Sequence, residues 1–222
     1  MKTNLLKLLF ALVVTIIAVS SCQKNDPYND DEWQKEQRRL DSLNRVRIEK
    51  LLEEQAPILK QYAEENMPGA VLDDSTGIWY KIHNSEDEES IRYRLVPVSG
   101  GLAISPRYTE VKYTGRLLDD AGTIFDETEE DKTAVFDIGS LIPAWYLTFW
   151  PKEIEYNLRN YVIGGFTPQG LNKGISVEIL TPSPYAYDNR ERKNEAGEVI
   201  IPADSPLHFH IEVVDLRDQE QK

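Results

Sequence analysis

The chain has 222 residues, a formal net charge of −13, and 41% hydrophobic and 28% charged residues. This composition fits one medium-sized folded domain with appendages and a soluble surface. An acidic chain repels phosphate backbones, so we do not expect nucleic acid as a partner. A single cysteine excludes an internal disulfide bond.

The N-terminal residues have the pattern of an export signal. Lys2 and Lys7 form a positively charged segment before an apolar run, residues 8–19, which is too short to span a bilayer comfortably but fits a signal peptide. Small residues then lead to Cys22, and this arrangement resembles the bacterial lipobox, in which the cysteine is acylated and becomes the new N-terminus. The alternative is an ordinary cleaved signal with an incidental cysteine. We predict a signal peptide over residues 1–21 and lipidation of Cys22, for example with palmitate.

A polar stretch, residues 22–30, follows the predicted anchor. Such a stretch acts as a flexible tether, and its acidic part also resembles the export signals of surface lipoproteins. Two or three acyl chains hold a protein firmly on a membrane, because each buried methylene contributes about 0.8 kcal/mol. The sequence therefore predicts a lipid-anchored protein of the bacterial cell envelope, at the outer membrane. It leaves open whether the periplasmic or the surface-exposed face carries it.

Residues 31–55 contain no Gly or Pro and alternate charges of both signs, with leucine and valine at roughly helical spacing. Pro57 suits the first turn of a second short helix, residues 58–65. The pattern predicts a helical stalk over residues 31–67, either a charged spacer or a dimerising helix. Because the apolar stripe is not a sustained heptad repeat, the spacer is favoured, and a monomer is favoured over a dimer.

From residue 68 onward the pattern changes to short strands. Strand-like segments occupy residues 78–82, 91–96, 110–117, 176–180 and 207–216. Helical pattern is scarce here, so we expect an α+β fold with an antiparallel sheet and one or two helices. We expect this domain, residues 68–222, to fold alone from about Val71, with little of its core in the stalk.

The histidines provide little for a metal site. His208 and His210 lie on one face of a predicted strand, but two ligands rarely suffice to hold a metal ion. With no second cysteine in the chain, the sequence predicts no metal.

Four sequence blocks in the strand-rich region are specific when taken together. They are VKYTGRL at residues 111–117 with FD at 125–126, FDIGSLIPAW at 136–145, a segment over 174–187 that ends in PSPYAY, and IIP at 200–202 with PLHFHIEV at 206–213. In this order they resemble the FKBP-type peptidyl-prolyl cis/trans isomerases, and they cover most of residues 75–216. The resemblance implies an FKBP-like fold, in which a curved antiparallel sheet wraps around a short helix.

The chemistry of prolyl isomerisation explains why such residues occur together. Rotation about a peptide bond faces a barrier of about 18–20 kcal/mol, because amide resonance must be broken. A catalyst needs no nucleophile, metal or cofactor, only a dry pocket that grips the proline ring and favours the twisted amide. The resemblance thus implies an isomerase of exported or cell-envelope polypeptides, with proline-containing clients as partners and no cofactor. The alternative is a catalytically inactive FKBP-like lipoprotein that binds peptides or a protein partner.

The resemblance also implies a role for each site residue. Trp145 would form the pocket floor and Ile142 would present its backbone amide. Tyr187 would donate its hydroxyl to a substrate carbonyl, and Asp126 would orient polar contacts at the rim. The aromatic walls would be Tyr113, Phe125, Phe136 and Phe209. Core packing explains any one aromatic equally well, but a carboxylate next to Phe125, at the end of a buried strand, needs a hydrogen-bonding partner, and this favours the site.

Two single residues depart from the family pattern. Ala144 stands where the family prefers Gly, which is a small change. Asp188 replaces the Gly after Ala-Tyr, which allows the loop over the ligand a different path.

The largest departure is an insertion around residues 146–170, which is rich in aromatic residues. Its VIGGF segment, residues 162–166, also resembles the block that precedes the floor residue, so Phe166 is the alternative floor. Trp145 is preferred because its spacing from Phe136 needs no gap. The insertion is expected beside the pocket, as a lid, a client-binding flap or a plug that ends catalysis.

Overall fold

The computed structural model describes residues 30–83 and 91–218. The chain divides into two compact units, Met1–Val46 and Arg47–Lys222. The predicted signal peptide, Cys22 and nearly all of the predicted tether lie outside the described residues. Within the described ranges, no helix is long and apolar enough to cross a membrane.

Helix α2 (Asp30–Asn66) replaces the two helices expected for the stalk, and Pro57 lies inside it. Proline in a helix interior removes one backbone hydrogen bond, but buried side chains on both sides of it, Gln55 and Leu59, anchor this stretch. In the described part of the first unit, the predicted apolar stripe is exposed, as at Leu43 and Val46.

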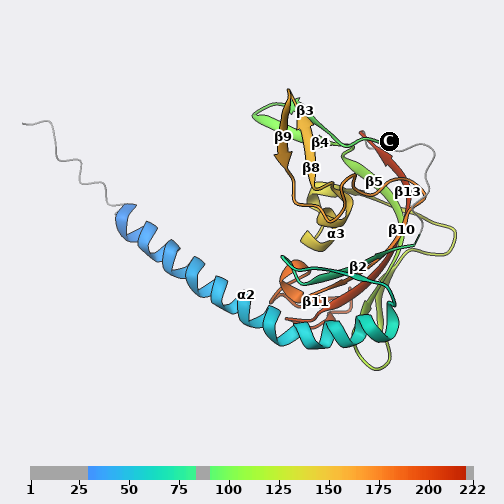
Figure 1. Cartoon of the computed structure of the whole chain (residues 1–222). Helices are drawn as coiled ribbons and strands as arrows, with labels where there is room; N and C mark the ends of the chain where they lie inside the picture. Colours follow the sequence, from blue (N-terminus) through green and yellow to red (C-terminus); the bar gives the residue numbers. More distant parts are fainter. Residues whose placement is uncertain (1–29, 84–90, 219–222) are drawn as a thin grey trace, which may run out of the picture. The chain divides into compact units, whose positions relative to one another are not determined.

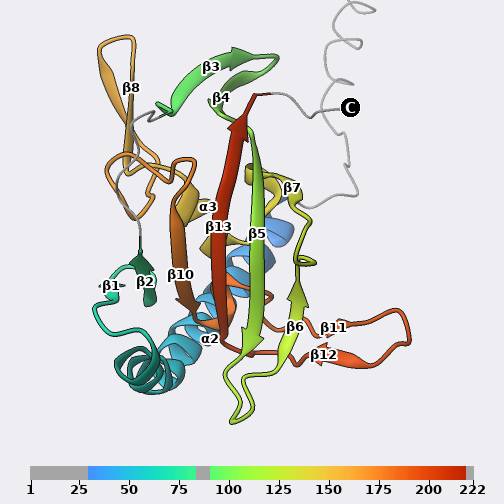
Figure 2. The same ribbon diagram turned by 90° about the vertical axis from the view of Figure 1, so that its right-hand side faces the viewer.

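The second unit is built on a seven-stranded antiparallel sheet with the order β1-β2-β10-β13-β5-β6, in which β7 also pairs with β5. Its strands are β1 (Val71–Asp73), β2 (Ile78–Ile82), β5 (Tyr108–Leu117), β6 (Ile124–Glu127), β7 (Ala134–Asp137), β10 (Ser176–Thr181) and β13 (Leu207–Arg217). The long strands β5 and β13 lie side by side at the centre of the sheet (Figure 2). The predicted strands at 78–82, 110–117, 176–180 and 207–216 are therefore confirmed.

In the described part of the unit, three two-stranded sheets and three short helices accompany the main sheet. The hairpins are β3 (Arg94–Val98) with β4 (Gly101–Ser105), β8 (Glu153–Tyr156) with β9 (Arg159–Val162), and β11 (Arg192–Lys193) with β12 (Val199–Ile201). The helices are η1 (Ile138–Ser140), α3 (Pro143–Phe149) and η2 (Ser183–Tyr185). The strand expected at residues 91–96 is β3, which pairs with β4 outside the main sheet.

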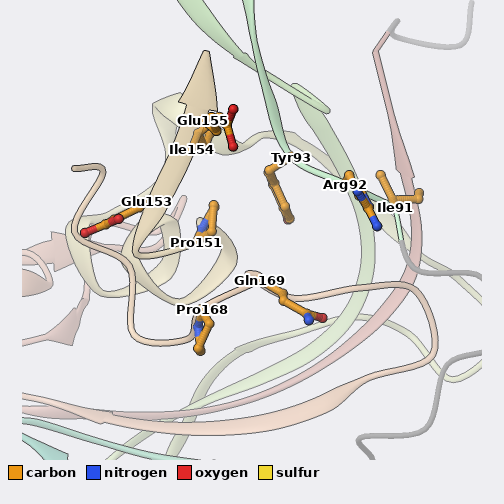
Figure 3. Close-up of a pocket in the computed structure, with 9 residues that line it drawn as sticks. All are labelled: Ile91, Arg92, Tyr93, Pro151, Glu153, Ile154, Glu155, Pro168 and Gln169. Carbon is orange, nitrogen blue, oxygen red and sulfur yellow. The ribbon is translucent and has the colours of Figure 1, made fainter. Parts of the chain in front are cut away.

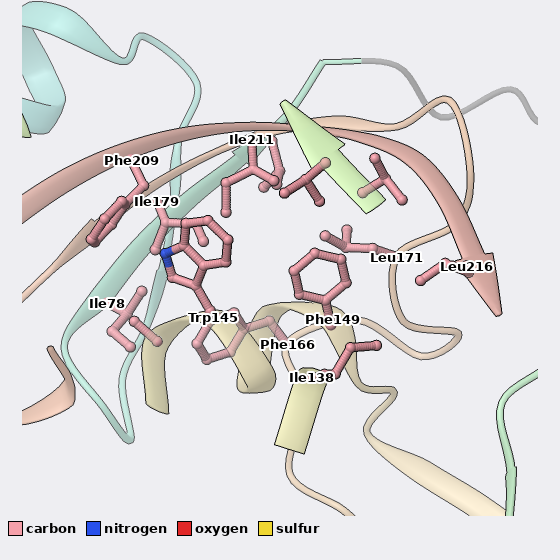
Figure 4. Packing of buried hydrophobic residues seen from close by; sticks show 14 of the residues in the cluster. Ile78, Ile138, Trp145, Phe149, Phe166, Leu171, Ile179, Phe209, Ile211 and Leu216 are labelled. Atoms are coloured by element: carbon pink, nitrogen blue, oxygen red, sulfur yellow. The ribbon is translucent and has the colours of Figure 1, made fainter. Parts of the chain in front are cut away.

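The core lies between the sheet and α3. Figure 1 shows β10, β13 and β5 curving around this helix. On β13, Phe209 and Ile211 alternate with outward-facing residues and are at most 2% exposed, as the two-residue period of a strand requires. Trp145 and Phe149 of α3 pack against them (Figure 4). The expected α+β fold, a curved antiparallel sheet around a short helix and preceded by a helix, is confirmed.

The end of α2 contributes a second core cluster, which corrects the expected domain boundary. Leu59, Ala63 and Met67 are 1–2% exposed and pack with Leu180 of β10. Leu59 and Ala63 lie four residues apart on one helix face, and Met67 directly follows the last residue of the helix. The compact unit begins at Arg47 rather than at residue 68, so the prediction that the stalk holds little of the core is wrong for residues 47–67.

Candidate functional site

A pocket with a cavity volume of about 290 Å³ opens on the inner side of the sheet. Its lining residues are Tyr113, Phe125, Asp126, Phe136, Ser140, Leu141, Ile142, Trp145, Tyr187 and Phe209. They come from β5, β6, β7, η1, α3 with the residues just before it, β13 and the segment after η2. The structure thus brings all eight predicted site residues to one place, although these lie far apart in the sequence.

The indole of Trp145 is fixed by aromatic rings on several sides. Its centroid lies 5.4 Å from Tyr113, 5.4 Å from Phe209 and 5.9 Å from Phe136, with interplanar angles of 80–88°. Edge-to-face contacts of this kind add stabilisation beyond the burial of apolar area. The Nε1 of Trp145 is buried and finds no hydrogen-bond partner among the described residues. A buried unpaired N–H is uncommon, and a carbonyl of a bound molecule is one group that would satisfy it.

Phe166, the alternative floor residue, lies outside this pocket. It is 3% exposed and stacks on Tyr80 of β2 with a centroid distance of 5.2 Å and an interplanar angle of 12°. The preceding Gly165 has a packing role, because a Cβ there would lie 1.7 Å from the backbone oxygen of Trp150. The VIGGF segment therefore serves close packing of the returning chain, and Trp145 lines the pocket.

The insertion does not fill the pocket. None of the described residues 146–170 is among those that line it. The insertion forms the end of α3, the β8–β9 hairpin and the return to β10. Of the three expected roles, the structure therefore speaks against the plug.

The polar rim of the pocket contains one short hydrogen bond. The hydroxyl of Tyr113 donates to Oδ2 of Asp126 at 2.7 Å. Burial, and then this hydrogen bond, raise the pKa of Tyr113, so the phenol remains a donor across the physiological range. Asp126 itself is exposed, and Tyr113 is the hydrogen-bonding partner of its carboxylate at the rim.

Gly115 of the first sequence block allows β6 to approach β5 closely. A Cβ at this position would lie 2.5 Å from Cζ of Phe125 and 3.1 Å from Cε1 of Phe209. These two rings meet edge to face, with centroids 5.8 Å apart. Glycine at 115 is therefore what lets the Phe125 ring form this wall of the pocket.

Besides Trp145, two residues that line the pocket have a donor without a protein partner among the described residues. The hydroxyl of Tyr187 makes no hydrogen bond there, and burial raises the pKa of this tyrosine. The backbone N–H of Ile142, just before α3, likewise pairs with no carbonyl of those residues. The guanidinium of Arg192 lies 5.2 Å from the centre of the Tyr187 ring, a distance at which cation–π attraction holds the ring.

Asp188, which follows Tyr187, adopts the left-handed conformation with φ of 55°. This conformation is one that glycine favours and that aspartate tolerates. The backbone at Asp188 thus stays in the glycine-favoured region in spite of the substitution. The carboxylate of Asp188 accepts two hydrogen bonds from Arg47, at 2.7 and 2.8 Å.

Sequence reasoning missed several members of this region. Ser140 and Leu141 line the pocket, and their position inside the FDIGSLIPAW block was a sufficient signal. Arg47 lies outside all four blocks, and nothing in its sequence surroundings marks it as a neighbour of Asp188.

Two other pockets lie beyond the predicted site. One, about 290 Å³ in volume, lies between the start of β3 and the β8–β9 hairpin (Figure 3) and is lined by Ile91, Arg92, Tyr93, Pro151, Glu153, Ile154, Glu155, Pro168 and Gln169. The other, about 520 Å³, lies between the β3–β4 hairpin, η1 and Trp150. It shares Ser140 with the candidate site and contains no predicted site residue.

All three histidines lie near one another on the outer face of the sheet. His83 Nε2 lies 2.6 Å and His208 Nε2 lies 3.4 Å from the carboxylate of Glu178, and the ring of His210 lies 6.1 Å from that of His83. In the described part of the chain, no group of three or more His, Cys, Asp or Glu side chains is suited to hold a metal ion.

Comparison with known proteins finds similarity in structure only. No family model and no curated protein matches the chain. The crystal structure of FkpA from Escherichia coli is 19% identical, with 95% of this chain and 81% of that chain covered and a TM-score of 0.47. The crystal structure of AtFKBP13 is 21% identical, with 66% of this chain and 98% of that chain covered and a TM-score of 0.44. A peptidyl-prolyl cis-trans isomerase from Pseudomonas syringae pv. tomato is 21% identical, with 77% of this chain and 96% of that chain covered and a TM-score of 0.45. At these identities and TM-scores, a function has to be inferred from the pocket itself.

Proposed function

We propose that this chain is a peptidyl-prolyl cis/trans isomerase that acts on exported or cell-envelope polypeptides. The observation that carries the proposal is the convergence of all eight predicted residues on one pocket that the insertion leaves unfilled. Its floor and walls are aromatic, and among its unpaired donors those of Tyr187 and Ile142 are suited to the carbonyls on either side of a proline.

The aromatic floor and walls lower the barrier to rotation about the prolyl bond. A planar amide is polar because resonance separates charge across it, and the twisted amide loses this resonance. Moving a polar group from water into an apolar pocket costs free energy. The pocket over Trp145 therefore penalises the planar ground state more than the twisted transition state, and this difference lowers the barrier.

The polar groups orient the substrate rather than react with it. The Tyr187 hydroxyl and the Ile142 N–H would each donate to a backbone carbonyl of the bound chain. The hydrogen bond from Tyr113 holds the Asp126 carboxylate at the rim, where it can face the substrate backbone. No proton, electron or group is transferred in this reaction, so the residues of the pocket suffice.

The test of this function is acceleration of cis-to-trans relaxation in a tetrapeptide with an apolar residue before proline, measured with the full chain. Asp126→Ala and Tyr187→Phe should each lower kcat/KM about fivefold, since a hydrogen bond is worth about 1 kcal/mol. Tyr161→Phe removes a hydroxyl from the β8–β9 hairpin, outside the pocket, and serves as the matched control.

A macrolide of the FK506 type should compete with the peptide for the same pocket. A folded chain that neither accelerates relaxation nor binds the macrolide would overturn the isomerase proposal. That result would favour the alternative, an inactive FKBP-like module that binds peptides or a protein partner.

The envelope location rests on Cys22 and the residues before it. We expect the wild-type chain to incorporate labelled acyl chains such as palmitate and to fractionate with the outer membrane. Cys22→Ala should abolish both. Equal membrane association and equal label in Cys22→Ala would refute the lipid anchor without affecting the proposed activity.

A further inference from the structure

The face of α2 that begins at Arg47 contacts the segment that carries Tyr187. The guanidinium of Arg47 forms a two-point ion pair with Asp188, Nη1 to Oδ1 at 2.8 Å and Nη2 to Oδ2 at 2.7 Å. Nη1 also lies 3.7 Å from the carboxylate of Asp204. A paired fork of this kind sets orientation as well as distance, because both N–H groups must align with both oxygens.

Two helical turns further on, about 12 Å along the axis, Gln55 holds the other end of the same segment. Its side chain is 5% exposed. Nε2 donates to Oγ of Ser183 at 2.9 Å and to the backbone oxygen of Asp204 at 2.8 Å, and Oε1 accepts from the backbone N–H of Ser183 at 2.8 Å. Both ends of this buried amide are thus hydrogen-bonded, as burial requires.

Tyr187 lies between these two anchored points. The backbone N–H of Asp188 donates to the oxygen of Ser183 at 2.8 Å, and the N–H of Asp204 donates to the oxygen of Asp188 at 2.8 Å. The segment 183–188 is therefore a closed turn, and one helix face holds it at both ends. Since the Tyr187 hydroxyl has no protein partner among the described residues, its direction depends on this turn and on the Arg192 contact.

We propose that Arg47 and Gln55 are positioning residues for Tyr187, so that α2 from Arg47 onward sets the direction of the hydroxyl in the pocket. This inference rests on the proposed isomerase function. It extends the candidate functional site to a helix that carries none of the four FKBP-like blocks. It also gives Asp188 a role, because this residue keeps a glycine-like backbone conformation and adds a carboxylate that docks the turn on α2.

The variants follow from the ion pair. Arg47→Gln removes the cation. Asp188→Gly removes the carboxylate while keeping the left-handed backbone available. Arg47→Lys keeps the charge but not the fork and should fall between wild type and Arg47→Gln. The matched control is Lys50→Gln, which breaks the 3.4 Å pair of Lys50 with Glu54 on the same helix.

The decisive measurement is a double-mutant cycle with Tyr187→Phe, using the full chain and the same X-Pro peptide. Arg47→Gln and Asp188→Gly should each lower kcat/KM about fivefold in the wild-type background, and the two together no more than either alone. In the Tyr187→Phe background, Arg47→Gln should have less than a twofold effect, because the hydroxyl it positions is gone. Lys50→Gln should leave kcat/KM unchanged in both backgrounds.

Two results would overturn the proposal. One is an equal loss from Arg47→Gln in both backgrounds, which would mean that Arg47 acts on the fold as a whole. The other is no loss in either background. Hydrogen exchange of the Ala186 and Asp188 amides provides a readout that is independent of activity. It should be faster in Arg47→Gln and unchanged in Lys50→Gln.

Hydrogen exchange of these two amides also separates this inference from the proposed function. If the wild-type chain does not accelerate peptide relaxation, the isomerase proposal fails, and the exchange measurement alone decides about positioning. Faster exchange in Arg47→Gln alone would then still support a turn held by α2. Unchanged exchange would refute it.

Discussion

The aromatic pocket and the contact between α2 and the Tyr187 turn are held together by different forces. The pocket consists of rings that meet edge to face around Trp145, and its shape follows from dispersion and the exclusion of water. The turn at residues 183–188 is held by directional hydrogen bonds from Gln55 and Arg47. Truncation of the rings around Trp145 should therefore mainly cost stability, whereas changes at Arg47 should mainly alter the orientation of one hydroxyl.

The largest effect is expected when α2 is removed altogether. A chain that starts at Val71 lacks Leu59, Ala63 and Met67, which cover Leu180, and burial of a Leu or Met side chain is worth about 1.5–3 kcal/mol each. We expect it to lose cooperative thermal unfolding in calorimetry, while a chain that starts at Arg47 keeps it. Cooperative unfolding of both chains at the same temperature would show that the pocket region is stable without α2.

Trp145→Ala should have the next largest effect. Truncation of a buried aromatic residue to Ala costs about 3–5 kcal/mol, because a cavity remains. Urea denaturation should show this loss in the free energy of unfolding. Trp33→Ala, at an exposed position in the first unit, is the control and should change the same quantity little. A small loss at Trp145 would mean that the surrounding rings collapse into the space.

Gln55→Leu should destabilise the second unit by about 2–3 kcal/mol. It keeps the side chain roughly the same size but leaves the N–H and the hydroxyl of Ser183, both buried, without their Gln55 partners, and each such group costs about 1–3 kcal/mol. Chemical denaturation measures the loss. Gln61→Leu, where an exposed amide contacts only Glu65 on the same helix, is the matched control. Equal free energies of unfolding for the two variants would contradict a stabilising role of the contact between Gln55 and Ser183.

The smallest expected effect is a pH dependence at the α2 contact. The hydroxyl of Tyr62 lies 3.1 Å from Nδ1 of His208. Burial lowers the pKa of His208, although nearby Glu178 acts in the opposite direction and Arg116 and His210 reinforce the shift. Because the folded state disfavours the protonated ring, the unfolded chain binds the proton more readily.

The stabilising contribution of neutral His208 should therefore be present above its unfolded pKa, near 6.5, and decline as the pH falls below that value. Urea denaturation between pH 7.5 and 5 should show this decline, and His208→Asn should reduce it. A His208→Asn chain with an unchanged pH slope would assign the decline to other groups.

The sequence alone was sufficient for the pocket because its residues lie in short blocks with a recognisable order. The resemblance of these blocks to the FKBP-type isomerases implied that Tyr113, Phe125 and Trp145 meet in one pocket, whereas local pattern alone explained each ring equally well as core packing. The exposure of Asp126 could not be predicted, since a four-residue strand gives no sign of which of its side chains face solvent.

The role of α2 was decided by the tertiary structure. Its charged composition hides the buried face, because Leu59, Ala63 and Met67 are separated by lysine, glutamate and glutamine, and Gln55 and Arg47 look like solvated helix residues until their partners are known. Those partners, Ser183, Asp188 and Asp204, lie 128–149 residues away in the sequence. No local periodicity reports contacts over such separations. The sequence therefore determined the aromatic site through the order of its four blocks and the resemblance that they carry, while the orientation of the Tyr187 turn was decided by the docking of α2.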